Sequence, residues 1–147
     1  MFKKDETKAT GKLKVEIKDK QGNVKETREI ENLVVDTGLA HIASRMKDAT
    51  ATAMSHMGIG TGTVAAASGN TALGTEAARV ALTSTTVTSN AVAYVCSFGA
   101  GTGTGAITEA GILNAASGGT LLCRTVYSVV NKGASDSMTI TWTVTIS

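Results

Sequence analysis

The sequence predicts a mainly β domain: an antiparallel β-sandwich or jelly-roll-like fold with one short helix at about residues 37–47 and an N-terminal charged hairpin. Three observations support this prediction. Several segments alternate apolar and polar residues, these segments recur at near-regular spacing, and Gly, Ser and Thr fill the loops of a chain without Pro. The 147 residues suffice for one core that needs no metal or disulfide.

The first two predicted strands form the charged hairpin. Residues 11–20 alternate apolar side chains with Lys and Glu, which is the pattern of a strand with one buried and one solvated face. A turn at 21–23 leads into a second strand at 24–35, which carries further charges. Residues 1–10 are polar, so we expect an N-terminal arm followed by a single β-rich domain over residues 11–147.

One helix is expected, at about residues 37–47. Asp36 or Thr37 can accept hydrogen bonds from the unpaired amides of a first helical turn. Apolar residues follow at the i, i+3, i+4 and i+7 spacing of a helix, namely Leu39, Ile42, Ala43 and Met46.

The rest of the chain is predicted to form strands joined by loops of small residues. The clearest strand is the last, in which apolar residues alternate with threonines, so that one face turns inward and a threonine face meets water or a partner. The predicted strands are residues 54–59, 79–87, 91–98, 106–113, 120–130 and 138–146, and the main loops are 60–70, 99–105 and 115–119.

Charge is concentrated in the first third of the chain. The formal net charge is +2, yet residues 1–50 hold 11 of the 14 Lys and Arg and 9 of the 12 Asp and Glu. Because these charges nearly cancel and alternate in sign, they do not form the single-sign surface that nucleic acid requires. We therefore do not expect nucleic acid as a partner. No segment has the pattern of a signal peptide or a bilayer span, so we do not expect a membrane as a partner either.

Two patterns invite a ligand-binding interpretation, and both have a simpler explanation. The glycine-rich run at 99–105 could cradle a phosphate, but such a loop needs a following helix, whereas a strand is predicted there with no Lys nearby. His41 lies between apolar positions of the predicted helix, His56 has no carboxylate or cysteine at metal-ligand spacing, and the two His and two Cys match no compact zinc pattern. We therefore expect structural roles, no metal and no cofactor.

Cys96 and Cys123 are too few for a disulfide scaffold. Cys96 lies inside a predicted strand, where buried thiols are usually inert, and this argues against a nucleophilic pair with either histidine. We favour buried free thiols at both positions. A disulfide, within a subunit or between subunits, is the alternative once the protein has left the reducing cytosol.

Ionisable residues are scarce after residue 50, which is a poor inventory for an enzyme, and we expect no catalytic residues. Glu109 and Arg124 lie in successive predicted strands within weakly charged sequence. Charges in such surroundings are normally retained because they pair with each other or with a neighbouring subunit. We therefore prefer a structural ion pair to a catalytic role.

At residues 32–46, 54–63, 105–114, 122–125, 130–133 and 142–144, the sequence resembles small structural proteins of tailed-bacteriophage particles. Among them is the order glutamate, small residue, glycine, apolar, apolar at 109–113, which is similar to closing strands of phage fibre, collar and head-accessory proteins. The resemblance covers about residues 32–147 and implies a virion protein, assembled in the host cytoplasm, without catalytic residues.

Within this class, size and composition favour a capsid decoration or cement protein that binds across major-capsid-protein subunits and stabilises the head. The expected partners are the major capsid protein or other virion proteins, and further copies of the chain in a homo-oligomer such as a trimer. The alternatives are a neck, collar, head-fibre or tail-fibre component, including one that binds the host surface. Outside this class, a small carbohydrate-binding adhesin would have Trp142 and Tyr94 as stacking candidates. An enzyme is the least favoured reading.

Overall fold

The computed structural model describes residues 8–47 and 51–147, and this part of the chain contains nine strands and one helix. All the strands join one sheet in the order β4-β3-β7-β8-β2-β1-β9-β6-β5, and each pairing is antiparallel. The elements are β1 (Ala9–Lys18), β2 (Val24–Val34), α1 (Asp36–Lys47), β3 (His56–Gly60), β4 (Glu76–Ala81), β5 (Ser84–Thr88), β6 (Ala91–Phe98), β7 (Gly105–Leu113), β8 (Leu121–Lys132) and β9 (Ser137–Ile146).

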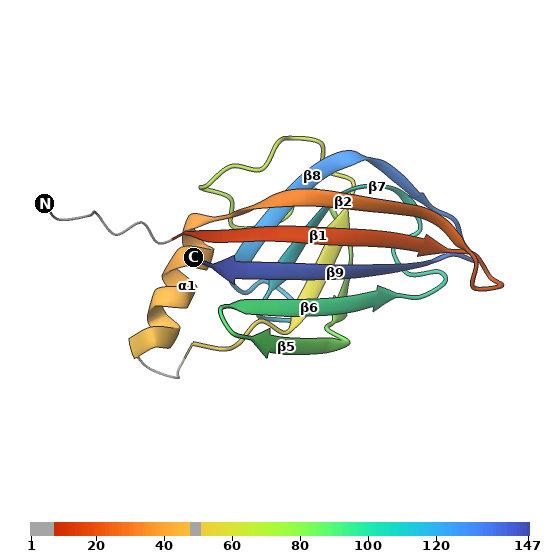
Figure 1. Cartoon of the computed structure of the whole chain (residues 1–147). Coiled ribbons are helices and arrows are strands. Elements are labelled where there is room, and N and C mark those ends of the chain that lie inside the picture. The colour runs from red at the N-terminus through yellow and green to blue at the C-terminus, as the bar shows by residue number, and fades with distance from the viewer. Residues whose placement is uncertain (1–7, 48–50) are drawn as a thin grey trace, which may run out of the picture.

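The sheet bends back on itself to give two layers. Strands β2, β1, β9, β6 and β5 form one layer, and β8, β7 and β3, continued by β4, cross behind it (Figure 1). On one side the layers are joined where β2 pairs with β8 through only two residue pairs. On the other side residues 82–83 link β4 directly to β5, and the thiol of Cys96 on β6 faces two main-chain oxygens of β4 at 3.6 and 3.7 Å. The apolar faces of both layers therefore enclose a common core.

Strand β9 shows how the sequence pattern builds this core. Met138, Ile140, Trp142 and Val144 are buried, whereas the threonines between them are partly exposed on the outer face. Side chains from both layers complete the core, because alternate residues of a strand point to opposite faces of a sheet. The predicted antiparallel, mainly β domain with one short helix is confirmed, and the predicted bounds of β6 agree with the structure.

One predicted strand, residues 79–87, is wrong, because the structure divides it between β4 and β5, which lie at opposite edges of the sheet order. The chain passes from one layer to the other at residues 82–83. There the amide of Leu82 donates to the carbonyl of Ser55, and the amide of Thr83 donates to the carbonyl of Val95. No Gly or Pro marks the crossing, so the alternation of the sequence runs through it without a visible break.

The predicted N-terminal arm is wrong at residues 8–10. The main chain of Lys8 exchanges two hydrogen bonds with Ser147, at 2.7 and 2.8 Å, and Ala9 and Thr10 belong to β1. These residues continue the alternation of β1, and β9 is long enough to pair with them, so their polar character does not keep them out of the sheet. Residues 1–7 of the predicted arm lie outside the described residues.

Helix α1 lies across one end of the sandwich (Figure 1) and contacts β8 through its first turn. The hydroxyl of Thr37 donates to the carbonyl of Leu121 at 2.8 Å. Gly38 permits the close approach, because a Cβ atom there would lie 2.1 Å from the main-chain oxygen of Leu122. The apolar residues of the helix are only partly covered: Ile42 packs against the core, but Leu39 is 47% exposed and Met46 is 84% exposed.

Candidate functional site

Glu109 on β7 and Arg124 on β8 form a buried ion pair that contacts the loop between β3 and β4. Their exposed fractions are 0% and 2%, and both Nε and Nη2 of Arg124 lie 3.1 Å from Oε1 of Glu109. The two residues come together because β7 and β8 are adjacent antiparallel strands, with Gly111 directly opposite Arg124. The structure therefore places these two predicted site residues in direct contact.

The carboxylate of Glu109 also binds the main chain of the loop that joins β3 to β4. Its Oε2 accepts the amides of Gly62 and Thr75 at 2.6 and 2.7 Å, and its Oε1 accepts the amide of Gly74 at 2.7 Å. A Cβ atom on Gly62 would lie 2.2 Å from Oε2, so only glycine allows this approach. Both carboxylate oxygens are thus fully occupied by donors from this protein.

The guanidinium group of Arg124 donates hydrogen bonds to carbonyl oxygens of the same loop. Nη2 donates to the main-chain oxygen of Val64 at 3.0 Å, and Nη1 donates to Oδ1 of Asn70 at 2.9 Å. Asn70 in turn accepts the amide of Ala67 at 2.8 Å. The ion pair therefore helps to fix the conformation of residues 61–75, together with the buried side chain of Leu73 and the hydrogen bond from Thr108 to the carbonyl of Gly62.

Two opposing effects act on the pKa of Glu109. Burial on its own would raise the pKa, but the amides of Thr75, Gly74 and Gly62 and the side chain of Arg124 stabilise the charged form, and the pKa lies below its ordinary value. Glu109 is consequently ionised at neutral pH and has no free lone pair directed at solvent. This arrangement suits a structural role rather than proton transfer.

A second buried charged group, which sequence reasoning did not single out, consists of Lys132 at the end of β8 and Asp136 before β9. Nζ of Lys132 donates to the carbonyls of Gly99 and Asp136 at 2.8 and 2.9 Å, and burial lowers the pKa of Lys132 although Asp136 opposes this effect. Oδ2 of Asp136 accepts the amide of Gly133 at 2.8 Å and Nζ of Lys25 at 2.9 Å. The signal that drew attention to Glu109, a charge in weakly charged sequence, applies to both residues.

The glycine-rich loop at 99–105 is anchored by this second group. Strand β7 follows the loop directly, as predicted, so no helix N-terminus faces it. Gly101, Gly103 and Gly105 have φ angles of 81°, 66° and 141°, which side chains other than glycine rarely adopt. These glycines serve the turn geometry, and the carbonyl of Gly99 binds Lys132.

Cys96 and Cys123 are both free and fully buried in the structure. Burial raises the pKa of Cys96 to about 11 and raises the pKa of Cys123 well above its ordinary value. The thiol of Cys96 is directed at the main-chain oxygens of Val80 and Ala81 rather than at a histidine. Both groups are protonated at neutral pH, and a thiol is a far weaker nucleophile than a thiolate.

The two histidines lie on different elements. His56 begins β3, and its Nδ1 lies 2.8 Å from the hydroxyl oxygen of Ser55. His41 lies on α1, and burial, with a smaller effect of Arg45, lowers its pKa. In residues 8–47 and 51–147, no three His, Cys, Asp or Glu side chains gather into a group that could hold a metal ion.

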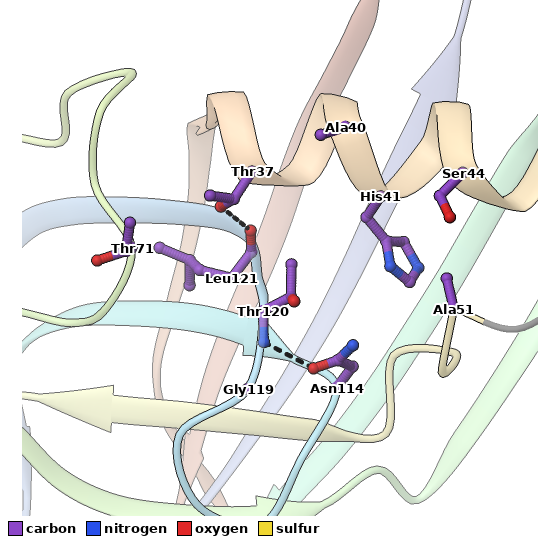
Figure 2. Close-up of a pocket in the computed structure, with 10 residues that line it drawn as sticks. All are labelled: Thr37, Ala40, His41, Ser44, Ala51, Thr71, Asn114, Gly119, Thr120 and Leu121. Carbon is purple, nitrogen blue, oxygen red and sulfur yellow. Dashed lines mark hydrogen bonds between the residues drawn. The ribbon is translucent and has the colours of Figure 1, made fainter.

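A hollow of about 520 Å³ lies between α1 and the loop that joins β7 to β8 (Figure 2). His41 and Ser44 reach into it from the helix, and Ala51, Thr71 and Thr120 are among the residues that line its other walls. The side-chain amide of Asn114 is already paired: its Oδ1 accepts the amide of Thr120 at 2.7 Å, and its Nδ2 donates to the carbonyl of Thr52 at 3.1 Å. These two hydrogen bonds of Asn114 connect the loop between β7 and β8 to the segment before β3.

The stacking candidates of the adhesin hypothesis are wrong. Trp142 is 0% exposed and Tyr94 is 9% exposed, and both belong to the apolar core. Alternation directs Trp142 inward, on the face of β9 opposite to its threonines, and Tyr94, its cross-strand partner on β6, lies on the same inner face. The ring of Trp142 cannot stack on a sugar unless the core opens, and Tyr94 reaches the surface only as part of the lining of an apolar groove beside α1.

No protein-family model, curated protein or solved structure matches this chain. Within the described part, no helix is long and apolar enough to cross a bilayer.

Proposed function

We propose that this protein is a structural component of a tailed-phage virion, and specifically a capsid decoration or cement protein that binds across major-capsid-protein subunits and stabilises the head. The proposal combines the sequence resemblance with the way in which the protein uses its buried charges. In this role the protein contributes a preformed binding surface, and its effect on the particle is mechanical.

The observation that carries the proposal is that the buried charged groups hold loop main chain. Glu109 and Arg124 together fix residues 61–75, and Lys132 and Asp136 fix the loop at 99–105 and the turn before β9. Burial of a charge costs free energy unless the charge is paired and hydrogen-bonded. Here the partners of the buried charges include loop main chain, so the same contacts keep these surface loops in one conformation. A preordered surface loses less conformational entropy on binding, which favours a lattice of many identical contacts.

The experiment that tests the proposal is a count of this protein against the major capsid protein in purified particles, by quantitative mass spectrometry. A decoration protein gives a count in the hundreds that scales with the shell lattice. A count of about six to a few dozen would assign the protein to the neck or the tail, and the proposed position on the head would be wrong. Absence from the purified particles would reject the virion role as a whole.

Particle stability provides a second readout. Particles that lack the protein should release DNA at a lower temperature than complete particles, and purified protein added back should restore the original temperature. The Glu109→Gln variant substitutes a fully buried residue, so weaker restoration by this variant would follow from the altered loop at 61–75 and not from a substituted surface residue. If the missing protein has no effect on DNA release, it does not act as cement.

A further inference from the structure

Strand β5 is an edge of the sheet that lacks a partner on one side. It stands at the end of the strand order and pairs only with β6 among the strands that the structure describes. Its five residues, Ser84–Thr88, are all exposed, and Val87 is 70% exposed. The outer edge of β5 is therefore open to another strand.

The turn that follows β5 fixes which main-chain groups point outward. Two residues, 89–90, close the β5–β6 hairpin, so Thr88 and Ala91 form the hydrogen-bonded pair next to the turn. Because hydrogen-bonded and non-hydrogen-bonded pairs alternate along antiparallel strands, Thr85 and Val87 lie at the non-hydrogen-bonded positions. The N–H and C=O groups of these two residues consequently point away from β6, to the open edge.

The two edges of the sheet differ in protection. Natural proteins usually protect an edge strand with charged residues, Pro or a covering segment. The other edge strand, β4, carries Glu76 and Arg79 in a salt bridge of 2.7 Å. The sequence of β5 is Ser-Thr-Thr-Val-Thr, which has no charge and no Pro, and its β-branched residues favour strand pairing. Strand β5 therefore has the properties of an edge that pairs with another strand.

We propose that β5 pairs with β5 of a second copy of this chain, in antiparallel orientation, about a two-fold axis at Thr86. In this register Thr85 lies opposite Val87 of the second copy, and Val87 lies opposite Thr85 of the second copy. The four outward main-chain groups of each strand then form four hydrogen bonds across the axis, and none remains unpaired. This complete self-complementarity is the reason for choosing a second copy over a different protein.

The side chains support the same register. Thr85 and Val87 line an apolar groove of about 450 Å³ between the end of the sheet and α1, which also includes Met46 and Val144. Pairing brings Thr85 and Val87 of both copies side by side at the mouth of this groove, and cross-strand pairs of β-branched residues stabilise a sheet. The uncharged edge offers nothing to attract a charged partner, whereas two identical uncharged edges do not repel each other.

This inference is independent of the virion proposal, because it concerns the purified chain in solution. A two-fold contact makes a dimer, so a trimer would require a different surface. The first measurement is the mass of the full chain by sedimentation equilibrium over micromolar to near-millimolar concentrations. We expect a reversible monomer–dimer equilibrium, and a protein that stays monomeric over the whole range would overturn the inference.

Cross-linking tests the register. Residues at a non-hydrogen-bonded pair have Cα atoms about 4.5 Å apart, which is compatible with a disulfide. Thr86→Cys should therefore give a covalent dimer on mild oxidation, and the native Cys96 and Cys123 are buried and should not compete. Thr88→Cys is the matched control, because the two introduced thiols would be about 14 Å apart along the strands. If both variants cross-link equally, or neither does, the proposed register is wrong.

Charge exchange tests the contact without a covalent bond. Thr86→Lys and Thr86→Glu each place like charges opposite each other at the axis, so each should raise the dimer dissociation constant at least about tenfold. An equimolar mixture of the two variants should form a heterodimer. Thr27→Lys, at an exposed position on β2, which is an internal strand of the sheet order, should leave the dissociation constant unchanged. If the two Thr86 variants dimerise as well as the native chain, β5 is not the interface.

Discussion

Replacement of Glu109 by Gln removes the negative charge of the buried ion pair while it keeps the shape of the side chain. Gln has only one oxygen, so it cannot accept all the hydrogen bonds that the carboxylate accepts from Gly62, Gly74, Thr75 and Arg124. Its NH₂ group would instead face N–H donors. The guanidinium of Arg124, which is 2% exposed, would be left as a buried charge without its counter-charge.

The cost follows from these contacts. The loss of one partner from a buried ion pair typically costs about 3–5 kcal/mol. Arg124 keeps its hydrogen bonds to Val64 and Asn70, so we expect the lower end, about 3 kcal/mol. For a chain of 147 residues the entropy of unfolding near the midpoint is about 0.3 kcal/mol per kelvin. The melting temperature should therefore fall by about 10 °C.

Thermal unfolding can be followed by the fluorescence of Trp142, the sole tryptophan of the chain, which is fully buried in the native core. The matched control is Glu29→Gln, which neutralises the same residue type in an exposed pair with Lys12 at 3.7 Å, where both side chains are 65% exposed. Such pairs contribute little, so the control should lower the melting temperature by no more than about 2 °C. If Glu109→Gln matched this control, the assignment of Glu109 as the anchor of the loop at 61–75 would be refuted.

Four further predictions follow from single features. Because the folded-state pKa of Glu109 lies below its ordinary value of 4.5, its contribution to stability is complete above that pH and is lost as the pH falls through the lowered pKa. The difference in melting temperature between the native chain and Glu109→Gln should therefore shrink below about pH 4, and a constant difference down to pH 2 would contradict this cause. Gly38→Ala should cost about 2 kcal/mol or more in urea unfolding, since the new Cβ meets a main-chain oxygen of β8 at 2.1 Å; an unchanged midpoint would show that the helix contact is looser than described. Ser89, at φ 54°, should tolerate glycine with a gain of about 1 kcal/mol, and a loss in calorimetry would contradict the strain argument. Cys96 and Cys123 should not react with a thiol reagent in the folded protein and should both react in denaturant, and rapid labelling of either in the native state would show that the core opens.

The sequence predicts the elements of this fold where one face of a strand is buried. In β9 the alternation is strict, and the observed strand extends only one residue before the predicted start. The prediction for 79–87 failed because periodicity reports which face is buried but not which layer the strand belongs to. The step between β4 and β5 depends on hydrogen bonds to Ser55 and Val95, which are distant in sequence from one another.

Helix α1 shows a second limit of pattern reasoning. Helical spacing places Leu39, Ile42 and Met46 on neighbouring positions, yet only Ile42 packs against the core. The helix docks through its first turn, where Gly38 and Thr37 contact β8, so its orientation is set by a glycine that carries no hydrophobic signal. An amphipathic pattern alone could not show that most of the apolar residues would remain uncovered.

The ion pair of Glu109 and Arg124 could be anticipated because charges are rare in that part of the sequence, and adjacent strands bring them within reach. The three amides that bind Glu109 could not be anticipated. They come from Gly62, Gly74 and Thr75, which lie 34 to 47 residues away in a loop without periodicity. Main-chain donors leave no trace in side-chain composition, so only the folded structure reveals this role of the loop.

The position of β9 between β1 and β6 has a consequence for the order of folding. Strand β1 pairs along its whole length with β9, although more than 100 residues separate them in the chain. During synthesis one side of the β1–β2 hairpin must therefore wait, unpaired, until β9 leaves the ribosome. Pairing over such a sequence separation is slow, on the order of milliseconds to seconds. The alternating Lys and Glu on the outer face of this hairpin keep it soluble in the meantime and discourage pairing with nascent neighbours.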